Sequence, residues 1–255
     1  MKLTAEEIQS NWEQFINYIG LYITGDRQQK LLDFYNKHKD ELIIMPASHK
    51  KMYHNSIVGG YIDHVLRVME ASLQINVVWN KFGVDNSTYT TEELIFSAMN
   101  HDLGKMGDGV EYAHILSTDK WRIDNLGENY KFNTKMDFMK VPDRSLFLLS
   151  QSGINISENE WIAIQTHDGL YDEGNNAYLK SYSNETKPRT ALLFILHQAD
   201  MLAARIEWER ENLSQFNKEG KLDTKSKIKN PKDNKQQKAI SSIKSEGLLN
   251  LLDKI

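Results

Sequence analysis

The spacing of the apolar residues is the feature of this sequence that most restricts its fold. Along several long stretches, apolar side chains recur at three- and four-residue steps, which is the period of a helix with one buried face. Between Gly59 and Gly83, for example, Ile62, Leu66 and Met69 follow this rule. Only four prolines occur in 255 residues, and no stretch alternates as a half-buried strand does. The sequence therefore predicts an all-α protein, a helical bundle with long loops.

Start and stop signals divide the chain into expected helices. These cover residues 5–20, 26–38, 59–82 and 91–103, a short stretch after Pro142, residues 157–169, and a long stretch after Thr190. Thr91 is the expected cap of its helix, with Glu92 and Glu93 in the first turn, where acidic groups favour the helix dipole. Residues 105–142 and 170–188 are polar and punctuated by glycine and proline, so we expect loops there.

The composition also suggests how the chain is divided. We expect N-terminal helices packed on the core (1–45), a main domain (46–215), a lysine-rich linker (216–239) and a C-terminal amphipathic helix (240–255). Between residues 217 and 238, eight lysines face three acidic residues. A solvated linker explains this run better than an arm that binds nucleic acid.

Several classes of protein are disfavoured by composition. There is no cysteine, which excludes disulfides, thiolate metal sites and cysteine nucleophiles. The net charge of −4 provides no general attraction to nucleic acid or anionic membranes. The segment MKLTAEEIQSNWEQF has no apolar run, so we do not expect it to be a signal peptide, and no apolar run elsewhere is long enough to span a bilayer. We expect a cytoplasmic protein without membrane contacts; the sequence does not predict its oligomeric state.

Histidines and aspartates interrupt the apolar faces of four expected helices. In the helix over 91–103 the apolar stripe leads directly to His101 and Asp102, and the other helices place His64, the pair His167–Asp168, and His197 with Asp200 in similar positions. One inward histidine is more often a hydrogen-bonded core residue than a ligand, and one inward aspartate can cap a helix. Four such helices favour a divalent cation, which would compensate buried carboxylates and accept imidazole ligands.

These motifs resemble the HD superfamily of metal-dependent phosphohydrolases. Its pattern is a histidine, an adjacent His–Asp pair and a distant aspartate, and His64, His101, Asp102 and Asp200 match it in order. The stretches GGYIDH, HDLGK and ILHQAD are typical of the superfamily. HNSIVGGYIDHVLRVME, IQTHDGLY and ILHQADMLAA are most similar to the HD domain of YhaM-type 3′→5′ exoribonucleases. The resemblance covers about residues 50 to 210.

The resemblance implies an HD-domain helical bundle over 46–215, with the four matching residues around one divalent metal: Mn²⁺, Mg²⁺, Fe²⁺, Co²⁺ or Ni²⁺. In some branches further histidines hold a second metal, and His167 matches one of them. Asp168 stands where related families often have another histidine. His114 is a further possible ligand, and His197 could touch the site or orient a ligand.

The expected chemistry is attack on phosphorus by a metal-activated water. Lys105 would stabilise charge on the phosphoryl oxygens, although a lysine here could equally neutralise a helix C-terminus. Asp168 or His167 would act as acid or base if not a ligand. For substrate binding we expect His54 and Arg67 at phosphate, and Tyr130, Lys135 and Tyr171 as further contacts; a surface role for Arg67 and loop packing for the others are the alternatives.

These expectations favour a hydrolase of a phosphoester or phosphoanhydride bond in a small nucleotide. The alternative is a phosphodiesterase or exonuclease acting on RNA or DNA ends, or on cyclic or short oligonucleotides, and the exoribonuclease-like motifs support it. A sensor that binds a nucleotide without turnover belongs to a different class, and the four intact ligand positions argue against it. A purely structural metal would reveal itself by loss of folding on chelation.

Overall fold

The structure, a computed structural model, describes residues 2–50 and 53–212, and this part of the chain is mainly helical, as predicted. The expected linker over 216–239 and helix over 240–255 lie outside the described residues. The α-helices are α1 (Ala5–Tyr22), α2 (Gly25–Lys37), α3 (Lys39–Leu42), α4 (Gly60–Lys81), α5 (Thr91–Asn100), α6 (Lys120–Leu126), α7 (Val141–Gln151), α8 (Glu158–Thr166), α9 (Asn176–Leu179) and α10 (Leu192–Asn212). Short 3₁₀-helices are η1 (Asn86–Thr88), η2 (Leu103–Met106), η3 (Gly169–Tyr171) and η4 (Glu173–Asn175), and the strands are β1 (His114–Leu116) and β2 (Tyr130–Phe132).

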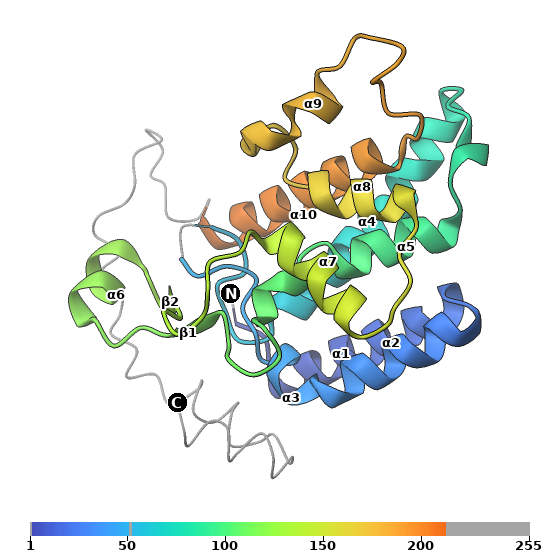
Figure 1. Cartoon of the computed structure of the whole chain (residues 1–255). Coiled ribbons are helices and arrows are strands. Elements are labelled where there is room, and N and C mark those ends of the chain that lie inside the picture. The colour runs from blue at the N-terminus through green and yellow to red at the C-terminus, as the bar shows by residue number, and fades with distance from the viewer. Residues whose placement is uncertain (1, 51–52, 213–255) are drawn as a thin grey trace.

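The first helix illustrates how local sequence fixes an element. Thr4 Oγ1 accepts a hydrogen bond from the Glu7 N–H at 3.2 Å, and the Glu7 carboxylate accepts one from the Thr4 N–H at 2.7 Å, which closes a capping box. Ile8, Trp12 and Phe15 then follow at four- and three-residue steps and are buried. Through this face α1 packs against α4, while α2 lies beside α1 (Figure 1).

The central helices converge around α5. All of α5 from Leu94 to Asn100 is buried, because α4 and α8 both pack against it and α10 packs along α4 and α8. Figure 1 shows this group in the middle of the molecule, with α1 and α2 on one side of it and the segment that carries α9 on the other. Two polar residues of α5, Ser97 and Asn100, are buried with its apolar ones.

The start of α7 rests directly on the turn after α5. A Cβ added to Gly104 would lie 2.2 Å from the Val141 carbonyl oxygen, so only glycine permits this approach. Ser145 Oγ accepts a 2.8 Å hydrogen bond from the Gly104 N–H and lies 3.0 Å from the His101 carbonyl oxygen. The end of α5 is thereby fixed against α7.

The loop between α3 and α4 turns back over the first turn of α4. Asn55 in this loop has a left-handed backbone conformation, with φ of 44°. A Cβ on Gly60 would lie 2.2 Å from the Asn55 carbonyl oxygen, so glycine is required where the loop crosses the helix. This crossing places the ring of His54 next to that of His64, with 4.6 Å between ring centroids.

Three sequence expectations need correction. Thr90, not Thr91, caps α5. Thr90 Oγ1 accepts a hydrogen bond from the Glu93 N–H at 3.1 Å, and the Glu93 carboxylate accepts one from the Thr90 N–H. The segment 105–142 is not all loop: β1 and β2 pair antiparallel with α6 between them. Each strand has three residues, too few for an alternating pattern to appear. The segment 170–188 likewise contains α9, all of η4 and the last two residues of η3.

Across the described ranges, none of the helices combines the length and the apolar character needed to cross a bilayer.

Candidate metal centre

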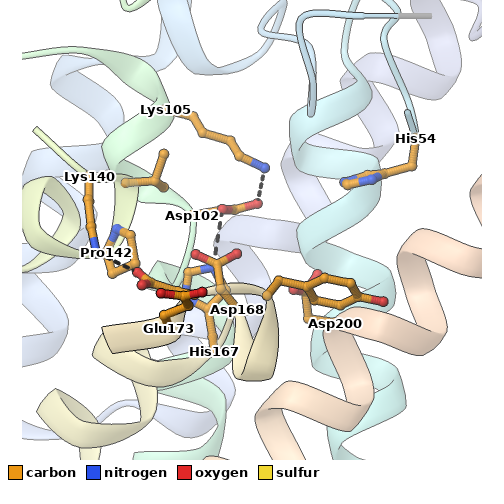
Figure 2. A pocket seen from close by; sticks show the side chains of 12 residues that line it. His54, Asp102, Lys105, Lys140, Pro142, His167, Asp168, Glu173 and Asp200 are labelled. Carbon is orange, nitrogen blue, oxygen red and sulfur yellow. Dashed lines mark hydrogen bonds and ion pairs between the residues drawn. The ribbon is translucent and has the colours of Figure 1, made fainter. Parts of the chain in front are cut away.

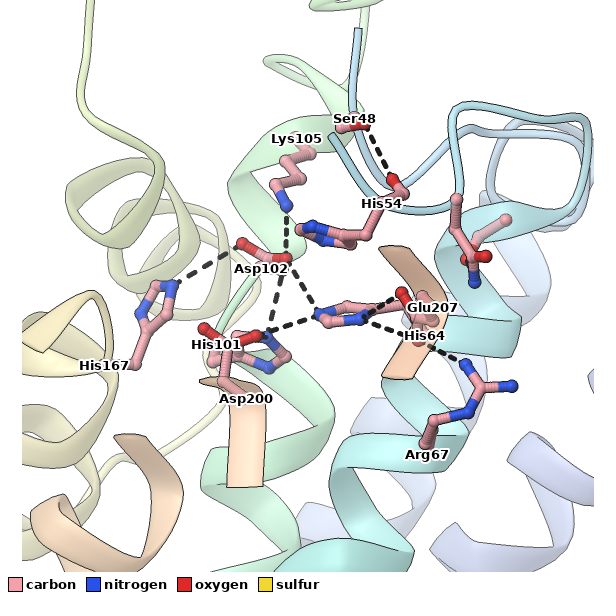
Figure 3. Close-up of polar contacts among 12 residues, drawn as sticks. Ser48, His54, His64, Arg67, His101, Asp102, Lys105, His167, Asp200 and Glu207 are labelled. Atoms are coloured by element: carbon pink, nitrogen blue, oxygen red, sulfur yellow. Dashed lines mark hydrogen bonds and ion pairs between the residues drawn. The ribbon is translucent and has the colours of Figure 1, made fainter. Parts of the chain in front are cut away.

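Three helices bring the four predicted ligand residues to one point. His64 lies on α4, His101 and Asp102 follow the last turn of α5, and Asp200 lies on α10 (Figure 3). His64 Nε2 is 3.2 Å from Asp200 Oδ1 and 3.6 Å from Asp102 Oδ2. His101 Nε2 is 3.5 Å from Asp102 Oδ2 and 3.9 Å from Asp200 Oδ1. Residues far apart in sequence are therefore within the span of a single metal-binding cluster.

The histidines present their Nε2 atoms to this cluster because their Nδ1 atoms are engaged elsewhere. His101 Nδ1 is 2.8 Å from the Ala98 carbonyl oxygen, and His167 Nδ1 is 2.8 Å from that of Ile164. Since a carbonyl only accepts, each Nδ1 carries the proton, and Nε2 of the neutral ring holds a lone pair. Within the described chain, Nε2 of His64 and of His101 is buried without a hydrogen-bond partner. The lone pairs on these Nε2 atoms and the carboxylates that they face are all groups that can bind a cation.

The shifted pKa values of the cluster show that its carboxylates favour nearby positive charge. Burial lowers the pKa of His64, but Glu207 and Asp200 outweigh it and raise that pKa to about 10. Burial likewise lowers the pKa of His167, while Asp102 and Asp168 raise it to about 9. Despite burial, which acts to raise it, the pKa of Asp102 is held well below its ordinary range by Lys105 and His101. A divalent cation would supply the charge that these carboxylates otherwise draw from protons.

The two oxygens of Asp102 face different groups of nitrogen atoms. Oδ2 faces His64 and His101, whereas Oδ1 is 3.6 Å from His167 Nε2, which in turn is 3.7 Å from Asp168 Oδ1. Among the described residues, three sets of three candidate ligands have atoms within 4.8 Å of one another: His64, His101 and Asp200; His101, Asp102 and His167; and His54, His64 and Glu207. These buried groups could hold a metal ion.

An open pocket of about 510 Å³ leads to the cluster (Figure 2). Such a volume lies in the range of small-molecule sites. The lining residues are His54, Asp102, Lys105, His167 and Asp200 around the cluster, Lys140, Val141 and Pro142 at the start of α7, and Asp168, Tyr171, Asp172 and Glu173 in the segment that follows α8. Lys140 Nζ and Asp172 Oδ2, 2.7 Å apart, form an ion pair that joins the last two of these segments.

Lys105 enters the site from η2. Its Nζ makes an ion pair with Asp102 Oδ2, the oxygen that also faces His64 and His101. Burial lowers the pKa of Lys105, but the charge of Asp102 outweighs it and raises that pKa, so the ammonium group stays charged. A fixed positive charge thus lies next to the candidate ligands and lines the pocket.

The other predicted residues divide into two groups. His54 lines the pocket with its Nε2 buried and unpartnered among the described residues, and burial and His64 lower its pKa to about 3. Tyr171 lines the pocket and is 86% exposed. Neither Tyr130, buried in β2, nor Lys135, paired with Glu111 at 3.3 Å, is among the lining residues.

Arg67 and the two further histidines also lie outside the pocket lining. Arg67 forms ion pairs with Glu207 and Asp63. His114 in β1 stacks on His49, with 5.7 Å between ring centroids. His197 Nδ1 is 2.8 Å from the His167 carbonyl oxygen, so it supports the backbone that carries His167.

Two residues of the site, Glu207 and Lys140, are not among those predicted from the sequence. Glu207 is almost fully buried, and its carboxylate lies 3.1 Å from His64 Nδ1. The sequence does contain a pattern that could have indicated Glu207. Glu207 lies seven positions after Asp200, which is two helical turns along the same face. Lys140 precedes α7 in a segment without apolar periodicity, so the sequence did not indicate that its side chain lines the pocket.

No protein-family model, curated protein or solved structure matches the chain. The functional proposal therefore depends on the geometry of the metal centre and on the resemblance of its motifs.

Proposed function

We propose that this protein is a metal-dependent phosphohydrolase of the HD type, which cleaves a phosphoester or phosphoanhydride bond of a small nucleotide. The observation that carries the proposal is the meeting of His64, His101, Asp102 and Asp200 beside an open pocket, with unpartnered Nε2 atoms turned inward. A cluster built only for stability would not need buried lone pairs that face carboxylates.

These four residues would hold the cation. Imidazole and carboxylate ligands suit Mn²⁺, Fe²⁺, Co²⁺ and Ni²⁺, and tolerate Mg²⁺. When bound, the ion supplies a water of lowered pKa and a positive charge for a phosphoryl oxygen. Asp102 Oδ1, His167 and Asp168 are the residues that would hold a second ion, because their ligand atoms adjoin the first group.

Lys105, through its charge, and His54, as a neutral ring, would bind the phosphoryl group. Lys105 keeps its charge beside Asp102 and would donate to an oxygen on which negative charge develops. His54 offers an imidazole nitrogen that has no partner among the described residues. If His167 binds no metal, it or Asp168 would exchange a proton with the leaving group or the attacking water.

The outer part of the pocket would accommodate the nucleoside. Tyr171 exposes its ring where the pocket opens and could stack on a base. Lys140 pairs with Asp172 at an exposed position, and a phosphate could replace that carboxylate as its partner. A volume of about 510 Å³ suits a small nucleotide.

A phosphodiesterase or exonuclease acting on the end of a nucleic-acid strand is the second candidate. The motif HNSIVGGYIDHVLRVME supports it through its similarity to YhaM-type enzymes, and so do the exposed Tyr171 and Lys140 at the pocket. Strand binding depends on phosphate contacts, so the affinity of such an enzyme would fall steeply as salt rises.

The test is a substrate panel run with Mn²⁺, Mg²⁺, Co²⁺ or Ni²⁺. Phosphate release and product mass are measured for nucleoside and deoxynucleoside triphosphates, nucleoside monophosphates, cyclic nucleotides and short oligonucleotides, with Asp102→Ala in parallel. Turnover of one small nucleotide that is lost in the variant would support the proposal. Shortening of oligonucleotides would favour the second candidate. A folded, metal-loaded protein that turns over none of these substrates would contradict both and favour a nucleotide sensor.

A further inference from the structure

A buried carboxylate lies behind the ring of His64, on the side away from the other candidate ligands. Glu207 is 1% exposed, and its two oxygens lie 3.1 and 3.2 Å from His64 Nδ1 (Figure 3). It does not line the pocket. A single helix, α10, therefore supplies one carboxylate, Asp200, in front of the ring and another behind it.

Arg67 holds this carboxylate in a fixed orientation. Its Nη1 contacts Glu207 Oε1, while its Nη2 lies 3.0 Å from Asp63 Oδ2. Asp63 in turn accepts a 2.7 Å hydrogen bond from Asn55 Nδ2, in the loop that carries His54. A buried carboxylate needs such a partner, because an unpaired charge in the interior is strongly destabilising.

A simple ion pair between α4 and α10 would not require the histidine. Glu207 and Arg67 already link those helices, yet the carboxylate also accepts a hydrogen bond from the N–H at His64 Nδ1. This hydrogen bond fixes the tautomer in which Nε2 carries the lone pair, fixes the plane of the ring, and makes Nε2 more basic. Nε2 is the atom that faces Asp200 and Asp102.

We infer that Glu207 is a positioning residue, which together with Arg67 orients His64 and sets the affinity of the site for a divalent cation. The inference rests on the proposed metal site and is independent of which bond the enzyme cleaves. Residues of this kind behind a metal-binding histidine change metal affinity about 10- to 100-fold when replaced.

The experiment compares Glu207→Gln with Glu209→Gln in the full chain. Glu209 is the matched control, since it lies on the same helix but pairs with Arg205 at 2.9 Å on the surface. Binding of Mn²⁺ is measured by calorimetry, the visible spectrum of the Co²⁺-loaded protein reports ligand geometry, and thermal melting is recorded with and without metal. We expect Glu207→Gln to bind Mn²⁺ about 10- to 100-fold more weakly, with an altered Co²⁺ spectrum, and Glu209→Gln to match the wild type.

A merely structural role gives a different result. Glu207→Gln would then melt earlier in both states but keep the wild-type affinity for Mn²⁺ and the wild-type Co²⁺ spectrum, which would overturn the inference. If Glu207→Gln does not fold, Arg67→Lys keeps the charge but loses the two-pronged geometry. It should weaken Mn²⁺ binding in the same direction, and unchanged affinity would overturn the inference.

The outcomes also separate this inference from the proposed function. A wild-type protein that binds no divalent metal would contradict both. One that binds Mn²⁺ through a Glu207-dependent site but hydrolyses nothing would contradict the phosphohydrolase alone.

Discussion

The hydroxyl group of Tyr35 donates a 2.7 Å hydrogen bond to Oδ1 of Asn100, the residue directly before His101. Both side chains are fully buried, and Asn100 Nδ2 donates to the Phe96 carbonyl oxygen at 2.7 Å. Through this bond α2, which contributes nothing to the pocket lining, fixes the end of the helix that presents the His–Asp pair.

Replacing Tyr35 by phenylalanine should therefore destabilise the protein. Tyr35→Phe leaves Asn100 Oδ1 buried without a donor, which costs about 1–3 kcal/mol. Urea denaturation measures the change. Tyr182→Phe is the control, because Tyr182 is 95% exposed, and it should alter stability by less than about 0.5 kcal/mol. Equal stability of the two variants would show that the bond has no net effect.

Arg27 joins the first turns of two helices. It pairs with Glu92 of α5 and with Glu160 of α8, whose side chain is fully buried, at 2.7 Å. Arg27→Ala should lower the free energy of unfolding by about 3–5 kcal/mol, because it leaves a buried carboxylate uncompensated. Arg205→Ala, which breaks an exposed pair, should cost less than about 1 kcal/mol. A small effect of Arg27→Ala, equal to that of the control, would contradict the prediction.

The ion pairs of Arg27 also predict how the difference in free energy of unfolding between wild type and Arg27→Ala depends on pH. The pKa of Glu92 is lowered because hydrogen bonds from Arg27 and Thr24 outweigh burial, so its contribution is present above its ordinary pKa and is lost as pH falls. Burial raises the pKa of Glu160, which therefore gains a proton readily in acid. A neutral carboxyl group forms no ion pair with Arg27, so removal of Arg27 costs less once Glu92 and Glu160 are protonated. The stability gap between wild type and Arg27→Ala should narrow below about pH 4.5, and a gap that widens there would refute this account.

Lys105 should contribute to turnover more than to metal binding. If it stabilises charge on the phosphoryl group, Lys105→Met should reduce kcat about 10²- to 10³-fold. Metal affinity should stay the same or rise, because Asp102 Oδ2 is released from its ion pair. Steady-state kinetics and calorimetry on the same preparation test both parts. A parallel loss of metal binding would mean that Lys105 acts by orienting Asp102.

Removing the metal should lower stability without unfolding the chain. At a free metal concentration of 100 times Kd, binding adds about 2.7 kcal/mol, which corresponds to roughly 5–11 °C in Tm for a domain of this size. Melting curves with EDTA and with added Mn²⁺ measure this shift, and Asp200→Ala should abolish it. Complete unfolding in EDTA would instead indicate a metal with a structural role.

Features with a helical period were predictable from the sequence, and features set by backbone crossings were not. His101 and Asp102 stood out because they continue an apolar stripe, and the structure places them beside His64 and Asp200. Tyr130 and Lys135 lie in a segment without periodicity, so composition alone gave no direction for their side chains, and neither lines the pocket. The Thr90 cap was misplaced by one residue because two threonines adjoin, and only the partner Glu93 distinguishes them.

The contact between Gly104 and the Val141 carbonyl oxygen links the wall of the pocket to the position of a candidate ligand. Val141 and Asp102 both line the pocket, and Asp102 lies two residues before Gly104. The distance between these two lining residues therefore depends on the backbone contact of Gly104 with Val141. A methyl group at position 104 would collide with the Val141 carbonyl oxygen, so either α7 or the turn that follows Asp102 would have to move. At this position, the dimensions of the pocket and the geometry of the candidate metal centre are therefore mechanically coupled.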